Sequence, residues 1–142
     1  MGKRRSGREL ALKILFQVDL TEITPDEALA RSMEATSADE ETIDFARRLT
    51  ESTVSHVPEI DALLAQYAKQ WPLDRMANVD RCLLRLATAE ILFHPDIPHS
   101  VSVDEAVELA KKYSTAESGR FINGVLGSLL RSPRFRDTPT TG

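Results

Sequence analysis

Three arginines near the N-terminus are the clearest candidates for functional residues in this sequence. Arg4, Arg5 and Arg8 lead directly into an apolar stripe with helical spacing. Guanidinium groups bind phosphates through paired hydrogen bonds and stack on bases. Arg5 and Arg8 are three residues apart, so they can share one face of a helix. One interpretation of this segment is that it binds a polyanion. The alternative, a basic arm that is merely solvated, fits the sequence about equally well.

A second group of suitable side chains, Arg120, Phe121 and Asn123, lies near the C-terminus. Single-stranded RNA is typically held by a mixture of cations, amides and a stacking ring. The ring has a competing interpretation, because Phe121 also fits the apolar stripe of its helix and can belong to the core. The two groups together favour RNA binding.

The distribution of charge indicates one limited surface for a polyanion. The net charge is −4. Residues 1–13 contain five basic side chains and one acidic side chain. Residues 14–115 contain nine basic and nineteen acidic side chains, and residues 116–142 contain four basic and two acidic side chains. The chain is therefore an acidic body with a basic head and a weakly basic tail, a pattern that suits such a surface.

Side chains typical of catalysis or metal binding are poorly placed for either. His56, His94 and His99 have no metal-ligand spacing with one another or with Cys82. Cys82 falls within an apolar stripe, where a small core residue is expected rather than a nucleophile. The sequence contains neither a Walker loop nor a dinucleotide-binding fingerprint. We therefore expect no enzymatic activity, no cofactor and no metal site.

Glu90 is an anomaly, because it falls within the most apolar predicted helix. A buried carboxylate needs a charged or hydrogen-bonding partner. Arg85 on the same helix, or a backbone amide at the start of another helix, could contribute. We expect a structural role for this carboxylate rather than a catalytic one.

Hydrophobic residues recur with helical spacing through nearly the whole chain, which predicts seven helices and no sheet. The helices are expected to begin near residues 6, 24, 37, 58, 75, 102 and 116. The helix over residues 75–93 is apolar on most sides and should be central to the core. Three of the starts carry the spacing of a capping box, at Ser6 with Glu9, Ser37 with Glu40 and Ser102 with Glu105.

The length of 142 residues fits one domain, residues 1–142, with a basic arm over 1–7 and a tail over 132–142 that we expect to be flexible. A single cysteine excludes an intramolecular disulfide, and no apolar run approaches the roughly 18 residues of a membrane span. We therefore expect a cytoplasmic protein.

Three segments of the sequence resemble the NusB family. They are RELALKILF from Arg8, VDRCLLRLATAEIL from Val79, and VSVDEAVELAKKYSTAESGRFINGVLGSLL from Val101. The last is the most diagnostic, because its EAVELAK and FINGVLG blocks have the separation seen in the family. Three positions depart from the usual residues: Ala89 replaces a common tyrosine, Asp104 an asparagine and Gly127 an aspartate.

The resemblance implies an all-α, seven-helix NusB-like fold of two packed helical bundles. It also implies a transcription antitermination factor that binds boxA RNA of ribosomal RNA operon leaders together with NusE, a ribosomal small-subunit protein. NusA, NusG and RNA polymerase complete the larger assembly. By position, the implied NusE contact is Asp80. The implied RNA-binding residues are Arg4, Arg5, Arg8, Arg75, Glu117, Ser118, Arg120, Phe121 and Asn123.

Two alternatives are left open. A similar helical domain precedes the catalytic domain of ribosomal RNA cytosine methyltransferases, but this sequence contains no cofactor-binding half. A helical scaffold that binds only proteins would use the acidic body and leave the basic head without a role. RNA binding that weakens with salt would distinguish the antitermination factor from such a scaffold.

Overall fold

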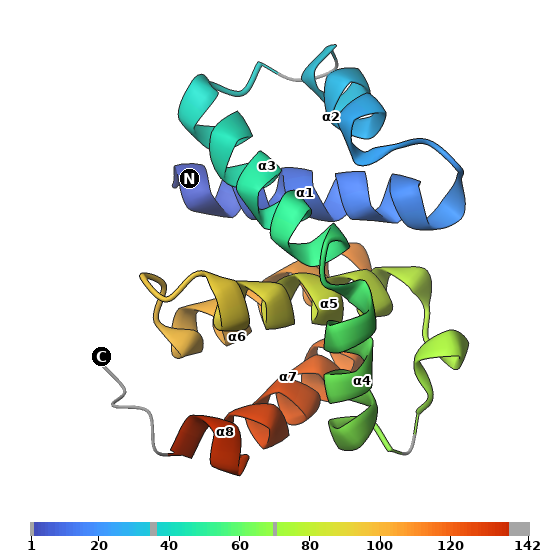
Figure 1. Cartoon of the computed structure of the whole chain (residues 1–142), viewed down its shortest axis with the longest axis vertical. Helices are drawn as coiled ribbons and strands as arrows, with labels where there is room; N and C mark the ends of the chain where they lie inside the picture. The colour runs from blue at the N-terminus through green and yellow to red at the C-terminus, as the bar shows by residue number, and fades with distance from the viewer. Residues whose placement is uncertain (1, 35–36, 70, 137–142) are drawn as a thin grey trace.

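The computed structural model describes residues 2–34, 37–69 and 71–136, in which every regular element is helical (Figure 1). The long helices are α1 (Lys3–Leu20), α2 (Pro25–Glu34), α3 (Glu40–Val54), α4 (Val57–Tyr67), α5 (Asn78–Phe93), α6 (His99–Tyr113) and α7 (Ala116–Leu130). A 3₁₀ turn, η1 (Leu73–Arg75), precedes α5, and a short helix, α8 (Pro133–Arg136), follows α7. The prediction of an all-α fold with seven helices is confirmed for these residues, and the two short elements are additions.

The helices form two groups that meet at α5. In Figure 1, α1, α2 and α3 lie together above α5, whereas α4, α6 and α7 lie below or behind it. α5 contacts α1, α3, α4, α6 and α7, and its residues 82–84 and 86–91 are buried. The expectation that residues 75–93 are central to the core is therefore confirmed. The apolar residues that surround this helix explain its position, because each side faces another helix.

A glycine allows α1 and α3 to approach closely. A Cβ atom at Gly7 would lie 2.7 Å from Cδ2 of Phe45 and 3.2 Å from the carbonyl oxygen of Thr42. A side chain at position 7 would therefore push α3 away from the N-terminal half of α1. That half carries the arginines for which the sequence suggested a function.

Local capping signals located some helix starts correctly and others wrongly. The hydroxyl of Thr24 accepts a hydrogen bond from the amide of Glu27 at 3.1 Å, which confirms the predicted start of α2. The start of α3 is capped by Asp39, whose carboxylate accepts from the amide of Thr42 at 2.9 Å, and not by Ser37. Aspartate and serine are comparable caps, so spacing alone did not separate them.

The other two capping boxes are wrong, because Ser6 and Ser102 lie inside helices. α1 begins at Lys3, so residues 3–7 are helical rather than part of the expected flexible arm. α6 begins at His99, directly after Pro98. The hydroxyl of Ser102 is used elsewhere, as described below.

At the C-terminal end, Phe135 of α8 packs against the core, so the expected flexible tail is helical from Pro133 to Arg136. Residues 137–142 of that expected tail lie outside the described residues. No helix in the described ranges is long and apolar enough to cross a membrane.

Candidate nucleic-acid interface

Arg4 and Arg5 lie at the surface and connect the first turns of α1 to the region around α6. Arg4 donates to Oδ2 of Asp96, in the loop before α6, at 2.9 Å. Arg5 binds both carboxylate oxygens of Glu105 on α6, at 2.9–3.2 Å. About half of each guanidinium side chain remains exposed, at 54% and 49%. Both cations are accessible to a ligand, and each already has an acidic neighbour.

Arg8 does not lie on that surface. It is 3% exposed, and its guanidinium donates to both oxygens of Glu90 on α5 at 2.5–3.0 Å. The hydroxyl of Ser102 on α6 donates to the same carboxylate at 2.9 Å. The assignment of Arg8 to an exposed RNA surface is therefore not supported, because this arginine is the counterion of a buried carboxylate.

Arg85, one of the candidate partners left open for Glu90, does not bind it. Arg85 points elsewhere and forms a paired interaction with the carboxylate of Asp61 at 2.8 Å. The structural role expected for Glu90 is supported, since Arg8 and Ser102 supply the charge and the hydroxyl that a buried carboxylate requires. Arg8 is 82 residues away in the chain, so no local signal could indicate it.

The first turn of α7 contains two of the implied RNA-binding residues, Glu117 and Ser118, and Ser118 contacts the implied NusE-binding residue. Thr115 caps the helix by accepting from the amide of Ser118 at 3.0 Å. The hydroxyl of Ser118 donates to Oδ2 of Asp80 on α5, also at 3.0 Å. The implied RNA residue Ser118 thus contacts the implied NusE residue Asp80. Glu117, beside them, is exposed.

Arg120 and Asn123 are exposed on one side of α7, where they line a shallow groove between α6 and α7 of about 480 Å³. The other polar side chains of the groove are Asp104, Glu108 and Lys111. Lys111 was not predicted, and its aliphatic chain lies over Gly119, where an added Cβ would be 3.2 Å from its Cγ. The groove offers two cations and an amide on its walls, together with two carboxylates.

Phe121 does not share the exposure of Arg120 and Asn123. It is half-buried and packs against the hydrophobic core, as the competing interpretation of this residue held. Part of the ring remains accessible, so a stacking role depends on that exposed part.

Neither Arg5 nor Arg75 is among the residues that line this groove. Glu108 lines the groove and, after the larger effect of Glu105, helps to raise the pKa of Arg5. Arg5, Arg120 and Asn123 therefore border one stretch of α6. Arg75 is exposed at the end of η1 and forms no ion pair with a described residue.

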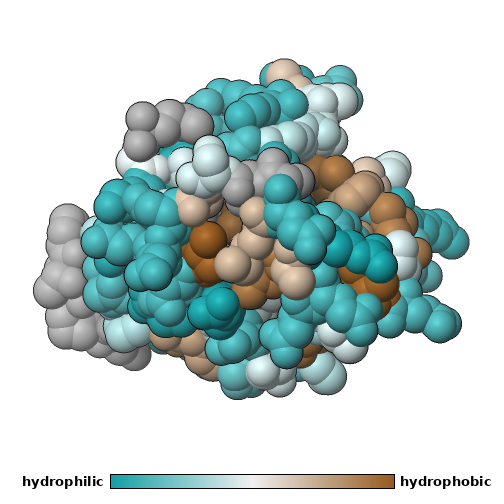
Figure 2. Space-filling view, turned by 90° about the horizontal axis from the view of Figure 1, so that it is seen from above, coloured by the Kyte–Doolittle hydropathy of each residue, from teal (hydrophilic) through white to brown (hydrophobic). Residues whose placement is uncertain are grey.

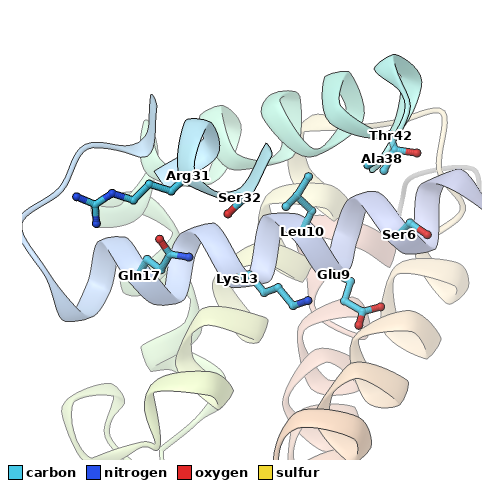
Figure 3. Close-up of a pocket in the computed structure, with 9 residues that line it drawn as sticks. All are labelled: Ser6, Glu9, Leu10, Lys13, Gln17, Arg31, Ser32, Ala38 and Thr42. Atoms are coloured by element: carbon cyan, nitrogen blue, oxygen red, sulfur yellow. The ribbon is translucent and has the colours of Figure 1, made fainter. Parts of the chain in front are cut away.

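A second hollow lies between α1, α2 and α3 and has a volume of about 400 Å³. Figure 3 shows its polar lining, with Gln17 and Lys13 from α1 and Arg31 from α2. Its single carboxylate, Glu9, already accepts hydrogen bonds from Lys112 and Tyr113 of α6. Seen from above, the surface of the molecule is mainly hydrophilic, with hydrophobic residues visible between the polar ones (Figure 2). The hollow contains no arrangement that suggests a reaction.

The residues considered for catalysis are used in packing. Cys82 is 2% exposed, which confirms it as a core residue, and burial raises the pKa of its thiol to about 12. His56 stacks on Phe93, and Nε2 of His94 lies 2.7 Å from the hydroxyl of Ser52. Within the described ranges, no three His, Cys, Asp or Glu side chains are arranged to hold a metal ion.

These features define a class of all-helical proteins in which exposed arginines border a groove between two helices. The profile of the NusB family matches residues 5–131, so this chain belongs to the NusB family. The family membership inferred from the three sequence segments is thereby confirmed.

Relatives and solved structures agree with this membership. A transcription antitermination protein NusB from Desulforamulus reducens is 51% identical over 127 residues, which cover 89% of each chain. The fold is similar to a Thermotoga maritima NusB structure, with a TM-score of 0.83 and 37% identity over 91% of this chain and 90% of that one. It is also similar to a chain in a crystal structure of antitermination factors NusB and NusE in complex with dsRNA. That comparison gives a TM-score of 0.82 and 30% identity over 91% of this chain and 96% of the other.

Proposed function

We propose that this protein is a non-catalytic transcription antitermination factor that binds boxA RNA of ribosomal RNA operon leaders together with NusE. The observation that carries the proposal is the group of exposed cations, Arg4, Arg5 and Arg120, around α6 and the first turns of α7. A relative named as an antitermination protein matches over 89% of its length, which favours this function over a methyltransferase domain. Because nascent RNA is made in the bacterial cytoplasm, the function implies a cytoplasmic protein.

In this proposal, the arginines supply phosphate attraction and α7 supplies base contacts. Arg4, Arg5 and Arg120 attract the backbone in a way that weakens with salt. The amide of Asn123 and the accessible part of the Phe121 ring then contact bases, with Glu117 and Ser118 at the start of the same helix. Arg75 contributes a further cation from η1.

NusE would bind beside Asp80, so that protein and RNA occupy neighbouring surfaces. The hydrogen bond between Ser118 and Asp80 supports this arrangement, because it joins the two proposed surfaces directly. A partner that binds next to the RNA increases the affinity of the pair through linked binding. NusA, NusG and RNA polymerase would join this pair in the larger complex.

The experiment is fluorescence anisotropy of a labelled boxA RNA, titrated with the protein alone and with NusE at several salt concentrations. We expect affinity to increase with NusE and to decrease with salt. The double variant Arg5→Glu/Arg120→Glu should weaken binding and reduce the salt slope by about 1.4, since each phosphate contact to a single strand contributes about 0.7. Arg131→Glu is the matched control, because Arg131 is exposed at the opposite end of α7.

Two results would contradict the proposal. Absence of boxA binding by folded protein, with and without NusE, would leave only the helical fold and the family. Binding to NusE without any binding to RNA would favour the protein-only scaffold.

A further inference from the structure

Trp71 is an exposed aromatic residue to which no role has been assigned. It lies in the connection between α4 and α5 and is 54% exposed. Tryptophan is usually well buried, and an exposed one that is held in place is characteristic of a binding surface. It is also the only tryptophan in the sequence.

The ring is attached to a well-anchored turn. Its Nε1 donates to the carbonyl oxygen of Arg75 at 3.2 Å. The turn itself is held by Met76, which is buried, and by Arg81, which donates to the carbonyl oxygen of Leu73 at 3.0 Å. The polar edge of the indole is therefore already satisfied within the protein. What remains for a ligand is the apolar surface of the ring, which favours stacking over hydrogen bonding.

The surroundings of the ring favour an unpaired base over a protein side chain. Arg75 and Lys69 are exposed cations without an ion pair among the described residues, and Asp74 is the one carboxylate between them in the sequence. Leu73 is half-buried and Met76 fully buried, so Trp71 is the only large hydrophobic side chain exposed in the described part of this turn, beside the smaller Pro72 and Ala77. A protein partner needs a central anchor surrounded by further contacts that exclude water. A single ring beside cations is sufficient for one base of a strand.

We propose that Trp71 is a stacking platform for one unpaired base of the bound RNA, with Arg75 binding an adjacent phosphate. This inference rests on the proposed function, because it assigns a further RNA contact to the same complex. It extends the RNA surface from α6 and α7 to the turn that precedes α5. Loss of one base–aromatic stack should weaken binding about tenfold.

The single tryptophan makes the inference directly measurable. An unlabelled single-stranded boxA RNA is titrated into the protein alone, and the fluorescence of Trp71 is followed alongside anisotropy of the labelled RNA. We expect the emission to be quenched over the same concentration range in which the anisotropy rises. RNAs with one abasic position are then compared, and one of them should bind without quenching, because its phosphates are intact and the stacked base is missing.

Variants provide the second measurement. Trp71→Ala should lower the affinity for boxA RNA about tenfold, and Trp71→Phe should retain most of it because a ring remains. Leu20→Ala is the matched control, since Leu20 is also 54% exposed but lies at the end of α1. Circular dichroism of each variant verifies that the fold is unchanged.

The outcomes separate this inference from the proposed function. If the labelled RNA binds while Trp71 emission stays constant and Trp71→Ala binds equally well, the stacking platform is refuted and the proposed function stands. If Trp71→Ala weakens binding of NusE and leaves RNA binding unchanged, Trp71 is a protein contact and the inference is wrong. If the RNA binds neither to the protein alone nor in the presence of NusE, the proposed function itself fails.

Discussion

The guanidinium of Arg8 on α1 and the carboxylate of Glu90 on α5 form a buried ion pair, with side chains that are only 4% and 2% exposed. Ser102 on α6 donates a further hydrogen bond to the same carboxylate. One carboxylate therefore connects three helices, two of which also carry the surface arginine Arg5 and its partner Glu105. The pair fixes α1 in the position in which Arg4 and Arg5 lie at the surface.

Breaking this pair should strongly destabilise the protein. We expect Arg8→Ala to lower the free energy of unfolding by about 3–5 kcal/mol, because Glu90 would be left buried without its counterion. Urea denaturation followed by circular dichroism measures the change. Arg5→Ala is the control and should cost at most about 1 kcal/mol, since half of that side chain is exposed. A small effect of Arg8→Ala would show that water or another residue can replace it.

Removing the acidic neighbour of Arg5 should strengthen RNA binding. Glu105 accepts hydrogen bonds from Nε and Nη2 of Arg5 and competes with a phosphate for these donors. Glu105→Gln is therefore expected to increase boxA affinity severalfold at low salt, with a smaller gain at high salt. Anisotropy titrations at two salt concentrations test this. A decrease in affinity would mean that Glu105 orients Arg5 for RNA instead of competing for it.

The hydrogen bond between Ser118 and Asp80 should couple the binding of RNA and NusE. Ser118→Ala removes the donor, and we expect the factor by which NusE tightens RNA binding to fall several-fold, as for the loss of about 1 kcal/mol of coupling. The factor is measured by titrating RNA with and without saturating NusE. Ser114→Ala is the matched control, because Ser114 contacts the same hydroxyl but not Asp80. An equal loss of coupling in both variants would contradict the assignment.

The cap of α3 should make stability depend on pH in the acid range. The amide of Thr42, the hydroxyl of the same residue and Lys3 lower the pKa of Asp39 from 3.8 to about 2. A carboxyl with a lowered pKa stabilises the fold fully above its unfolded value, and this stability is lost as the pH falls toward about 2. The Tm of Asp39→Ala should therefore lie below that of the unmodified protein at pH 7, and the difference should narrow below about pH 4. Asp44→Ala, in the middle of the same helix, should show little difference at either pH. A Tm difference between the two proteins that stays constant down to pH 3 would mean that the charge of Asp39 is not the cause of the stabilisation.

Cys82 should be unreactive in the folded protein. Its burial, and secondarily the charge of Asp19, raise the pKa of the thiol to about 12, so thiolate is scarce at pH 8. We expect Ellman's reagent to titrate no thiol in the native state and one thiol in denaturing urea. Rapid reaction of the native protein would show that α5 opens more readily than its burial indicates.

Much of the fold could be predicted from local patterns in the sequence. The apolar stripe over residues 75–93 identified the central helix, and Thr24 with Pro25 located the start of α2. Such signals are local, because a cap acts within three residues and a stripe within one helix. Ser6 and Ser102 match the same capping pattern but lie inside helices. The pattern failed there because it does not record whether a hydroxyl has another use.

The sequence by itself determined the helices, the acidic body with its basic ends and the family, because these depend on residue types and short spacings. Only the tertiary structure decided what each arginine does. Arg5 and Arg8 are equivalent in sequence, but Arg5 meets Glu105 at the surface and Arg8 meets Glu90 in the core. Their partners are 100 and 82 residues away, and the packing of α1 on α3 and α5 selects which side chain is buried. Burial then makes one arginine a structural counterion and leaves the other exposed at the surface.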